Sequence, residues 1–283
     1  MPVSRRASGP SAAVRALASQ VHPVFMLPPV ACSWFGAFLA GAVSFPVGAL
    51  HATAIFAAVY VAHVKDGYVD FYVRGEDDDH PLTRTGCLVG LGGATALFCV
   101  CLVGLWLLAS PGAVAVTLPT WFVGYLHAPQ MDTNPVTATT GYPLGIGLSI
   151  LGGYYAQAGA VAPVAVAFAV VFVVLLSGVK VIDDAQDFEY DRSIEKRTVA
   201  VVLGRARARA TAYTLMAVAL LAVVSLAAVA VFPPSSVLAV VGFAAVAVVA
   251  RRADPELATM LLVRGSYVFL ALLLAAVWFR PLS

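Results

Sequence analysis

Residues 183–204 read DDAQDFEYDRSIEKRTVAVVLG and follow directly on the apolar run 161–182. That run matches the roughly 20 residues that a helix needs to cross the hydrocarbon core of a bilayer. Asp184, Asp187 and Asp191 are spaced i, i+3 and i+7, so a helix that continued through them would carry all three carboxylates on one face. The junction therefore predicts a membrane span that ends in an acidic cluster.

The composition of the whole chain is that of an integral membrane protein. Of its 283 residues, 61% are apolar and 11% are charged, and the mean hydropathy is +0.90. A soluble domain carries about 25% charged residues, and a disordered chain needs still more polarity, so both classes are excluded. A net charge of only +2 gives no basic face for nucleic acid. Membrane lipid is the expected surrounding, and no obligatory protein partner is evident.

Apolar stretches recur along the chain at lengths near that of a bilayer crossing. We expect an all-α, multi-pass transmembrane helical bundle with about nine transmembrane helices, formed by one domain over residues 21–283 after an N-terminal tail, residues 1–20. The nine stretches cover residues 24–43, 46–65, 86–109, 112–126, 141–158, 161–182, 208–231, 236–250 and 257–279.

Lysine and arginine are distributed unevenly between the predicted loops. The tail holds three, the loop after the second stretch holds three more, and residues 180–209 hold seven, whereas the loops after the first, third, fifth and seventh stretches hold none. Basic loops stay in the cytoplasm. With nine crossings of the cell membrane, the N-terminus and both acidic loops, 65–85 and 183–207, are expected on the cytoplasmic side.

A second acidic segment ends the second stretch, where residues 65–79 read KDGYVDFYVRGEDDD. Of the 15 acidic residues, 12 fall in the two segments, and Asp66 and Asp70 are spaced i,i+4. Like charges on one helix face repel, and carboxylates at a helix C-terminus oppose the macrodipole, so this arrangement favours a bound cation. Carboxylates suit Mg²⁺, which commonly bridges them to phosphates. The pattern indicates metal-assisted handling of a diphosphate at the membrane surface.

The chain has three lysines, and all of them border the acidic segments. They are candidates for binding diphosphate oxygens, although ordinary positive-inside anchoring explains them almost equally well. His80 is expected on the surface of its loop. The basic candidates are Lys65, Arg74, Lys180, Lys196 and Arg197.

The stretch from residue 183 resembles the second aspartate-rich motif of the UbiA superfamily of intramembrane prenyltransferases, DxxDxxxD followed by KRT and a short apolar run that ends in Gly. Asp184, Asp187 and Asp191 match its acidic positions, and residues 196–198 are KRT.

The first segment is similar to that family's NDxxDxxxD motif, with Asp66 in the Asn place and Asp70 at the second acidic position. Gly67 stands at the first acidic position and Arg74 at the third, so Asp77 is the candidate that replaces the missing carboxylate. The resulting form resembles DYxDxxxGxD of the 1,4-dihydroxy-2-naphthoate polyprenyltransferase branch, as does LGGYYAQAG at 151–159. The segment HAPQMDTNP, which follows the fourth stretch, lacks the basic residues usual there.

The resemblance implies a bundle around a central cavity, in which a polyprenyl diphosphate binds with its head on Mg²⁺ and its tail in an apolar tunnel. The prenyl group would pass to a lipophilic acceptor: a quinone-ring precursor, a glycerol-based lipid or a carotenoid. The catalytic candidates are Asp66, Asp70, Asp187 and Asp191, and the metal ligands add Asp77 and Asp184.

Two alternatives come from other classes of protein. A cation-coupled secondary transporter would also bind cations through acidic pairs, but transport sites usually lie near the bilayer midplane rather than at one face. A membrane alcohol phosphotransferase shares Mg²⁺ and acidic sequence, but its DGxxAR pattern is absent after Asp66 and Gly67.

Overall fold

The structure is a computed structural model that describes residues 2–279. Helices account for most of this range, which contains no β-strand. They are α1 (Pro10–Ala18), α2 (Pro23–Leu39), α3 (Phe45–Val69) with the π-turn Asp70–Arg74, α4 (Arg84–Leu108), α5 (Pro111–Leu126), α6 (Pro135–Ala158), α7 (Pro163–Gln186), α8 (Phe188–Ser193), α9 (Val199–Leu203), α10 (Arg205–Ala228), α11 (Val237–Ala250) and α12 (Pro255–Phe279).

Each of the predicted membrane stretches lies on a helix, so the all-α prediction is confirmed. Within the described range, five helices are long and apolar enough to cross a membrane: α4, α7, α10, α12, and α3 together with its π-turn. A sixth is counted if α1 and α2, which meet at 69°, form one broken span. The chain is thus an integral membrane protein, and about nine crossings stay a prediction.

The chain divides into two compact units, and α6 contributes to both. The first comprises Leu148–Val161 and the described residues up to Met131; the second comprises Asp132–Gly147 and the described residues from Ala162 onward.

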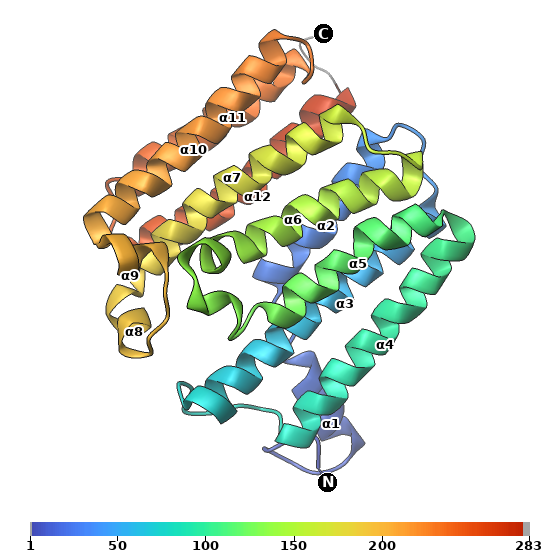
Figure 1. The fold of residues 1–283 in the computed structure, drawn as a ribbon, viewed down its shortest axis with the longest axis vertical. Helices are drawn as coiled ribbons and strands as arrows, with labels where there is room; N and C mark the ends of the chain where they lie inside the picture. Colours follow the sequence, from blue (N-terminus) through green and yellow to red (C-terminus); the bar gives the residue numbers. More distant parts are fainter. Residues whose placement is uncertain (1, 280–283) are drawn as a thin grey trace. The chain divides into compact units, whose positions relative to one another are not determined.

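In the first unit, α3 packs against α2, α4 and α5 (Figure 1). Small side chains make these contacts close: Ala57 and Ala58 of α3 are buried with Phe98 of α4. A Cβ atom on Gly124 of α5 would lie 2.4 Å from the carbonyl oxygen of Ala58. Small residues are common where membrane helices approach each other closely.

Glycines also bring α2 and the second half of α6 together in the first unit. A Cβ atom on Gly36 would lie 2.1 Å from the Ile150 carbonyl oxygen, and one on Gly153 would lie 2.0 Å from the Ser33 carbonyl oxygen. Real Cβ atoms do not approach backbone so closely, so the two backbones meet only because both positions are glycine.

The second unit is held by aromatic packing between α7, α11 and α12. Phe172 and Phe243 both contact Phe269 edge-on, with ring centres 5.5 and 5.8 Å apart, and Phe168 stacks on Phe232. Such pairs stabilise a core by about 0.5–1.5 kcal/mol each beyond their buried area.

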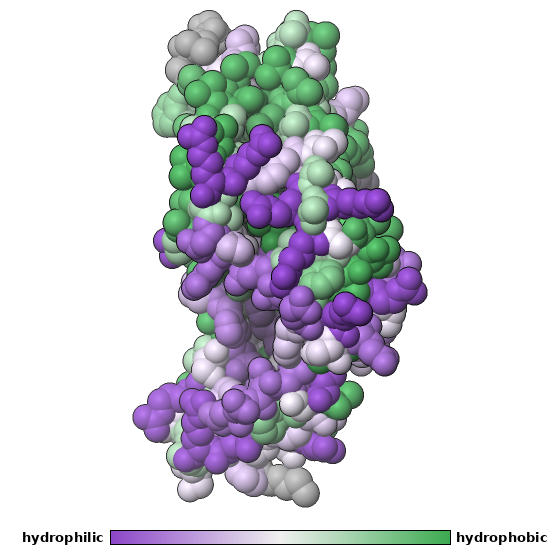
Figure 2. Space-filling view, turned by 90° about the vertical axis from the view of Figure 1, so that its left-hand side faces the viewer, coloured by the Kyte–Doolittle hydropathy of each residue, from purple (hydrophilic) through white to green (hydrophobic). Residues whose placement is uncertain are grey.

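On the face drawn in Figure 2, hydrophobic residues cover the upper part and hydrophilic residues gather in patches.

The segment predicted as an N-terminal tail is folded. Helix α1 buries Ala12 and Ala16, and Ala16 packs with Val64 of α3 and Leu82. The Tyr60 hydroxyl donates a 2.8 Å hydrogen bond to the Leu17 carbonyl oxygen. Basic charge alone did not indicate these contacts.

Replacing Gly153 by Ala forces the α2–α6 contact apart, because backbone rather than a movable side chain occupies the space. We expect a loss of about 1–3 kcal/mol of stability, typical of overpacking, measured by circular dichroism during thermal unfolding in detergent. Gly92 is the matched control, since it is exposed on α4 and a Cβ there meets nothing within 4 Å. Equal behaviour of Gly153→Ala and Gly92→Ala would contradict the close contact.

Candidate functional site

The first acidic cluster lies where α3 ends. Asp66 is in the last turn of α3 and Asp70 opens the π-turn, so the predicted helical spacing of the two carboxylates is confirmed. Arg74 reaches back to Asp70, with Nη1 3.5 Å from Oδ1. Gly75, at φ 68°, reverses the chain and lets the Glu76 amide donate a 2.8 Å hydrogen bond to the Asp70 carbonyl oxygen. A left-handed residue is cheapest as glycine.

Lys65 precedes this cluster but is engaged elsewhere in the first unit. Its ammonium donates to the Tyr125 carbonyl oxygen and, at 3.0 Å, to Gln130 Oε1, and lies 3.8 Å from the centre of the Tyr125 ring. These contacts place a cation at the C-terminal end of α5, where the helix dipole is negative. Binding a diphosphate would require Lys65 to exchange these partners.

The acidic loop is pinned by the start of the chain. Ser4 pairs with Leu82 as an isolated antiparallel bridge, and the Arg5 amide donates a 2.9 Å hydrogen bond to the Pro81 carbonyl oxygen. Arg6 forms an ion pair with Asp79, and this hydrogen bond lowers the pKa of the Asp79 carboxyl. We call residues 2–6 with residues 79–83 the N-terminal clasp. It holds Asp79 through the ion pair with Arg6, although Asp79 is exposed, as Asp77 and Asp78 are.

His80 is buried, so the prediction of a loop-surface histidine is wrong. Its ring stacks on Phe71 at 5.7 Å between centres, Nε2 lies 3.5 Å from Cys87 Sγ, and burial lowers its pKa. A Cβ atom on Gly67 would lie 2.7 Å from His80 Cε1. The imidazole therefore fills the space that a side chain at position 67 would need.

The second acidic cluster begins at the end of α7. Lys180 lies between two carboxylates, with Nζ 2.7 Å from Asp184 Oδ1 and 2.8 Å from Asp183 Oδ2. Asp184 is 2% exposed. Sequence patterning found Asp184 and Lys180 but not that they pair.

The expectation of one helix through all three aspartates is wrong. Helix α7 ends at Gln186, Asp187 is the junction residue, and Asp191 lies in the separate short helix α8. Asp187 is instead the residue before α8, where the positive end of the helix dipole favours a carboxylate.

A turn after α8 brings Lys196 back to Asp191. Glu195 adopts a left-handed conformation at φ 60°, the Lys196 amide donates a 2.9 Å hydrogen bond to the Asp191 carbonyl oxygen, and Lys196 Nζ lies 3.7 Å from Asp191 Oδ1. Burial raises the pKa of Asp191 to about 6, although Lys196 opposes this rise. Burial also raises the pKa of Asp187, and Asp183 adds to this effect.

Sequence reasoning missed Asp132, whose backbone contacts the segment that follows the second cluster. It is buried in the second unit, and its carbonyl oxygen accepts a 2.9 Å hydrogen bond from the Arg197 amide, while the Arg197 side chain is exposed. The isolated acidic residue in segment 127–135, which has no lysine or arginine, was the available signal.

The donor chemistry of the second cluster fits a Mg²⁺ ion. Asp184 Oδ2 and Asp191 Oδ2 are buried carboxylate oxygens without a hydrogen-bond partner in the described range, and such groups are costly unless something binds them. Within residues 2–279, no three acidic, histidine or cysteine side chains converge closely enough to enclose an ion. Both carboxylates instead contact lysines through their other oxygens. The two aspartate side chains would therefore have to turn to bind one metal ion together.

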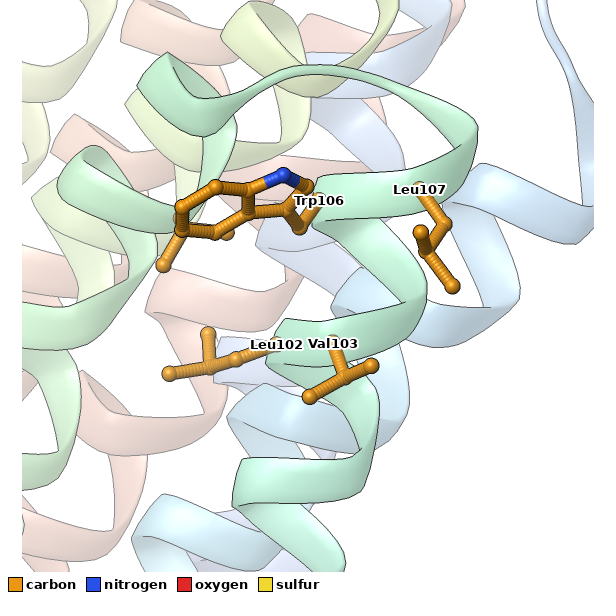
Figure 3. A pocket seen from close by; sticks show the side chains of 5 residues that line it. Leu102, Val103, Trp106 and Leu107 are labelled. Carbon is orange, nitrogen blue, oxygen red and sulfur yellow. The ribbon is translucent and has the colours of Figure 1, made fainter.

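The first unit also contains an apolar pocket. It measures about 310 Å³ and is lined by Leu102, Val103, Trp106, Leu107 and Val114, at the end of α4 opposite to the acidic loop (Figure 3). Its lining contains no ionisable group.

No protein-family model and no curated protein matches this sequence, but solved structures match the fold. An apo UbiA homolog from Aeropyrum pernix K1 matches with a TM-score of 0.70 at 14% identity, over 89% of this chain and 98% of that one. A digeranylgeranylglyceryl phosphate synthase matches at 0.68 and 13%, over 94% and 96%. A UbiA homolog from Archaeoglobus fulgidus bound to GPP and Mg²⁺ matches at 0.65 and 14%, over 94% and 99%. The chain therefore has the fold of the UbiA homologues.

Proposed function

We propose that this protein is a Mg²⁺-dependent intramembrane prenyltransferase that moves a prenyl group from an allylic diphosphate to a lipophilic acceptor. The observation that carries the proposal is the second cluster, where buried carboxylates paired with lysines end an apolar span. The fold supports it, because similar structures carry GPP or DMAPP together with Mg²⁺.

Both acidic clusters serve one diphosphate in this proposal. Asp66, Asp70 and Asp77 would hold one Mg²⁺, and Asp184, Asp187 and Asp191 would hold a second. Bound Mg²⁺ supplies Lewis-acid stabilisation of the charge that develops on the departing diphosphate. The diphosphate oxygens are bound by cationic side chains, and the candidates are Lys65, Arg74, Lys180, Lys196 and Arg197.

The reaction breaks the bond between the allylic C1 carbon and its diphosphate oxygen, and the electron pair leaves with the diphosphate. A nucleophilic atom of the acceptor then forms a bond to C1 and loses its proton. The role of the protein is to orient the diphosphate and to exclude water, which would otherwise convert the allylic cation to an alcohol.

The acceptor is proposed from the lipophilic compounds that suit an apolar cavity. A quinone-ring precursor follows from the resemblance to the 1,4-dihydroxy-2-naphthoate branch. A glycerol-based lipid and a carotenoid belong in the same test, and one of the similar structures is itself a digeranylgeranylglyceryl phosphate synthase.

We expect purified protein in lipid to form a prenylated product from geranylgeranyl diphosphate, Mg²⁺ and one member of that acceptor panel, identified by mass. Asp187→Ala and Asp191→Ala should each reduce turnover below a tenth, because each removes a ligand and leaves neighbouring carboxylates without their cation. Activity above that level at matched membrane amounts would contradict the metal cluster. Cation-driven transport without product would favour the transporter.

The proposal also requires both acidic loops on the cytoplasmic side of a chain with about nine crossings. With native cysteines replaced, a cysteine at Glu76 and another at Arg205 should both react with a membrane-impermeant thiol reagent from the cytoplasm alone. Labelling of the two positions from opposite sides would contradict this topology.

The exposed carboxylates of the first loop complete the first metal site in the proposal. Asp77 lies close enough to Asp70 for their charges to interact. Replacing Asp77 and Asp78 together by Asn should raise the Mg²⁺ concentration needed for turnover and the share of prenyl alcohol. Asp79→Asn is the matched control, since Asp79 is held in the N-terminal clasp, and it should leave the Mg²⁺ requirement unchanged. If the double variant behaves like this control, Asp77 and Asp78 only solvate the surface.

A further inference from the structure

Two lysines pair with carboxylates of the second cluster. Lys180 contacts Asp183 and Asp184 at 2.8 and 2.7 Å, and Lys196 lies 3.7 Å from Asp191. Each contact uses only one oxygen of the buried aspartates, because Oδ2 of Asp184 and of Asp191 has no hydrogen-bond partner in the described range. The lysines thus cover half of each buried carboxylate.

The charges in this cluster leave room for one divalent ion. Four carboxylates interact with one another and with the two ammonium groups: Asp183, Asp184, Asp187 and Asp191. Four negative and two positive charges leave −2, which one Mg²⁺ would cancel. Without the two lysines, the four carboxylates would carry a charge of −4. One Mg²⁺ would then cancel only half of it.

Because Asp184 and Asp191 are buried, the metal-free protein needs the lysines as their counter-ions. Asp184 is 2% exposed and Asp191 is 3% exposed, so their ionised forms would be costly without a counter-ion. A lysine ammonium on a flexible four-carbon stem can act as that counter-ion and can later move to another anion. The Lys180 side chain is 27% exposed and that of Lys196 is 25% exposed, so both ammonium groups keep a route to a ligand.

We propose that Lys180 and Lys196 act as exchangeable counter-ions, which occupy the carboxylates of the empty site and pass to the diphosphate when Mg²⁺ takes their place. This rests on the proposed function and adds a coupling to it. Without diphosphate, an ammonium that the metal displaces gains only water as its new partner, so metal alone binds weakly. Diphosphate gives the ammonium a new partner, so metal and diphosphate bind cooperatively, and the metal site forms fully only when substrate is present.

Lys65 illustrates that this arrangement is specific to the second cluster. Its ammonium is directed to the Tyr125 carbonyl oxygen and Gln130 rather than to a carboxylate. The two acidic clusters therefore differ in how they meet a metal: the first carries no lysine counter-ion in its described contacts, although Arg74 pairs with Asp70.

The test measures Mn²⁺ binding by electron paramagnetic resonance, with Mn²⁺ in place of Mg²⁺ and the full chain in nanodiscs of neutral lipid. Without diphosphate, Lys180→Met should bind Mn²⁺ at least about fivefold more tightly than the wild type, the lower end of typical couplings between sites. With inorganic diphosphate, the wild type should gain Mn²⁺ affinity, and Lys180→Met should gain less.

Arg205→Met is the matched control. It also removes one cation of the second unit, but Arg205 pairs with the exposed Glu189 at 3.7 Å, outside the cluster. Its Mn²⁺ affinity should equal that of the wild type. If Lys180→Met does not fold as a monodisperse protein, Lys196→Met is measured, and the same increase is expected through Asp191.

Two failures are distinguishable. If the lysine variant binds Mn²⁺ no more tightly than Arg205→Met while the wild type binds Mn²⁺ with diphosphate, the exchange of counter-ions is overturned and the proposed function stands. If the wild type binds no Mn²⁺ even with saturating diphosphate, the metal site is overturned and the exchange with it.

Discussion

A carboxylate buried at the end of an apolar helix needs a positive partner, and the second cluster is arranged around that need. Asp184 and Asp191 are almost fully buried, and each pairs with a lysine through one oxygen, while the other oxygen has no hydrogen-bond partner among residues 2–279. Desolvation offsets much of the attraction between buried charges, so apolar residues in place of these pairs would cost little stability. Retaining ionic groups here is understandable if they exchange partners during function.

The first cluster meets the same electrostatic problem in a different way. It is partly open, Arg74 reaches back to Asp70, and the N-terminal clasp removes Asp79 from the acidic loop by pairing it with Arg6. His80 fills the space beside Gly67, so this cluster has one fewer place for a carboxylate. Because the first cluster has fewer carboxylates and the N-terminal clasp holds Asp79, the exposed Asp77 is the proposed additional ligand of the first metal site. The two clusters are therefore unequal contributors to the proposed chemistry.

Composition and periodicity were sufficient to predict the helices, because an apolar run of bilayer length has few other structures available to it. The spacing of Asp66 and Asp70 was likewise sufficient, since the chain stays helical from α3 into the π-turn that Asp70 opens. The break at Asp187 was not predictable from spacing, which assumes a continuous helix. The N-terminal clasp and the burial of His80 depend on contacts between residues more than 70 positions apart or on ring packing around a glycine. No local pattern encodes such contacts.

The proposed function requires both acidic clusters to act on one diphosphate, and a double-mutant cycle tests this requirement most directly. The affinity of the protein for geranylgeranyl thiodiphosphate with Mg²⁺ would be measured for the wild type, Asp70→Asn, Asp187→Asn and the double variant. The account predicts non-additive losses with a coupling free energy of at least about 1 kcal/mol, as expected for groups that share a ligand. Losses that add within about 0.5 kcal/mol, the usual result for independent sites, would contradict it.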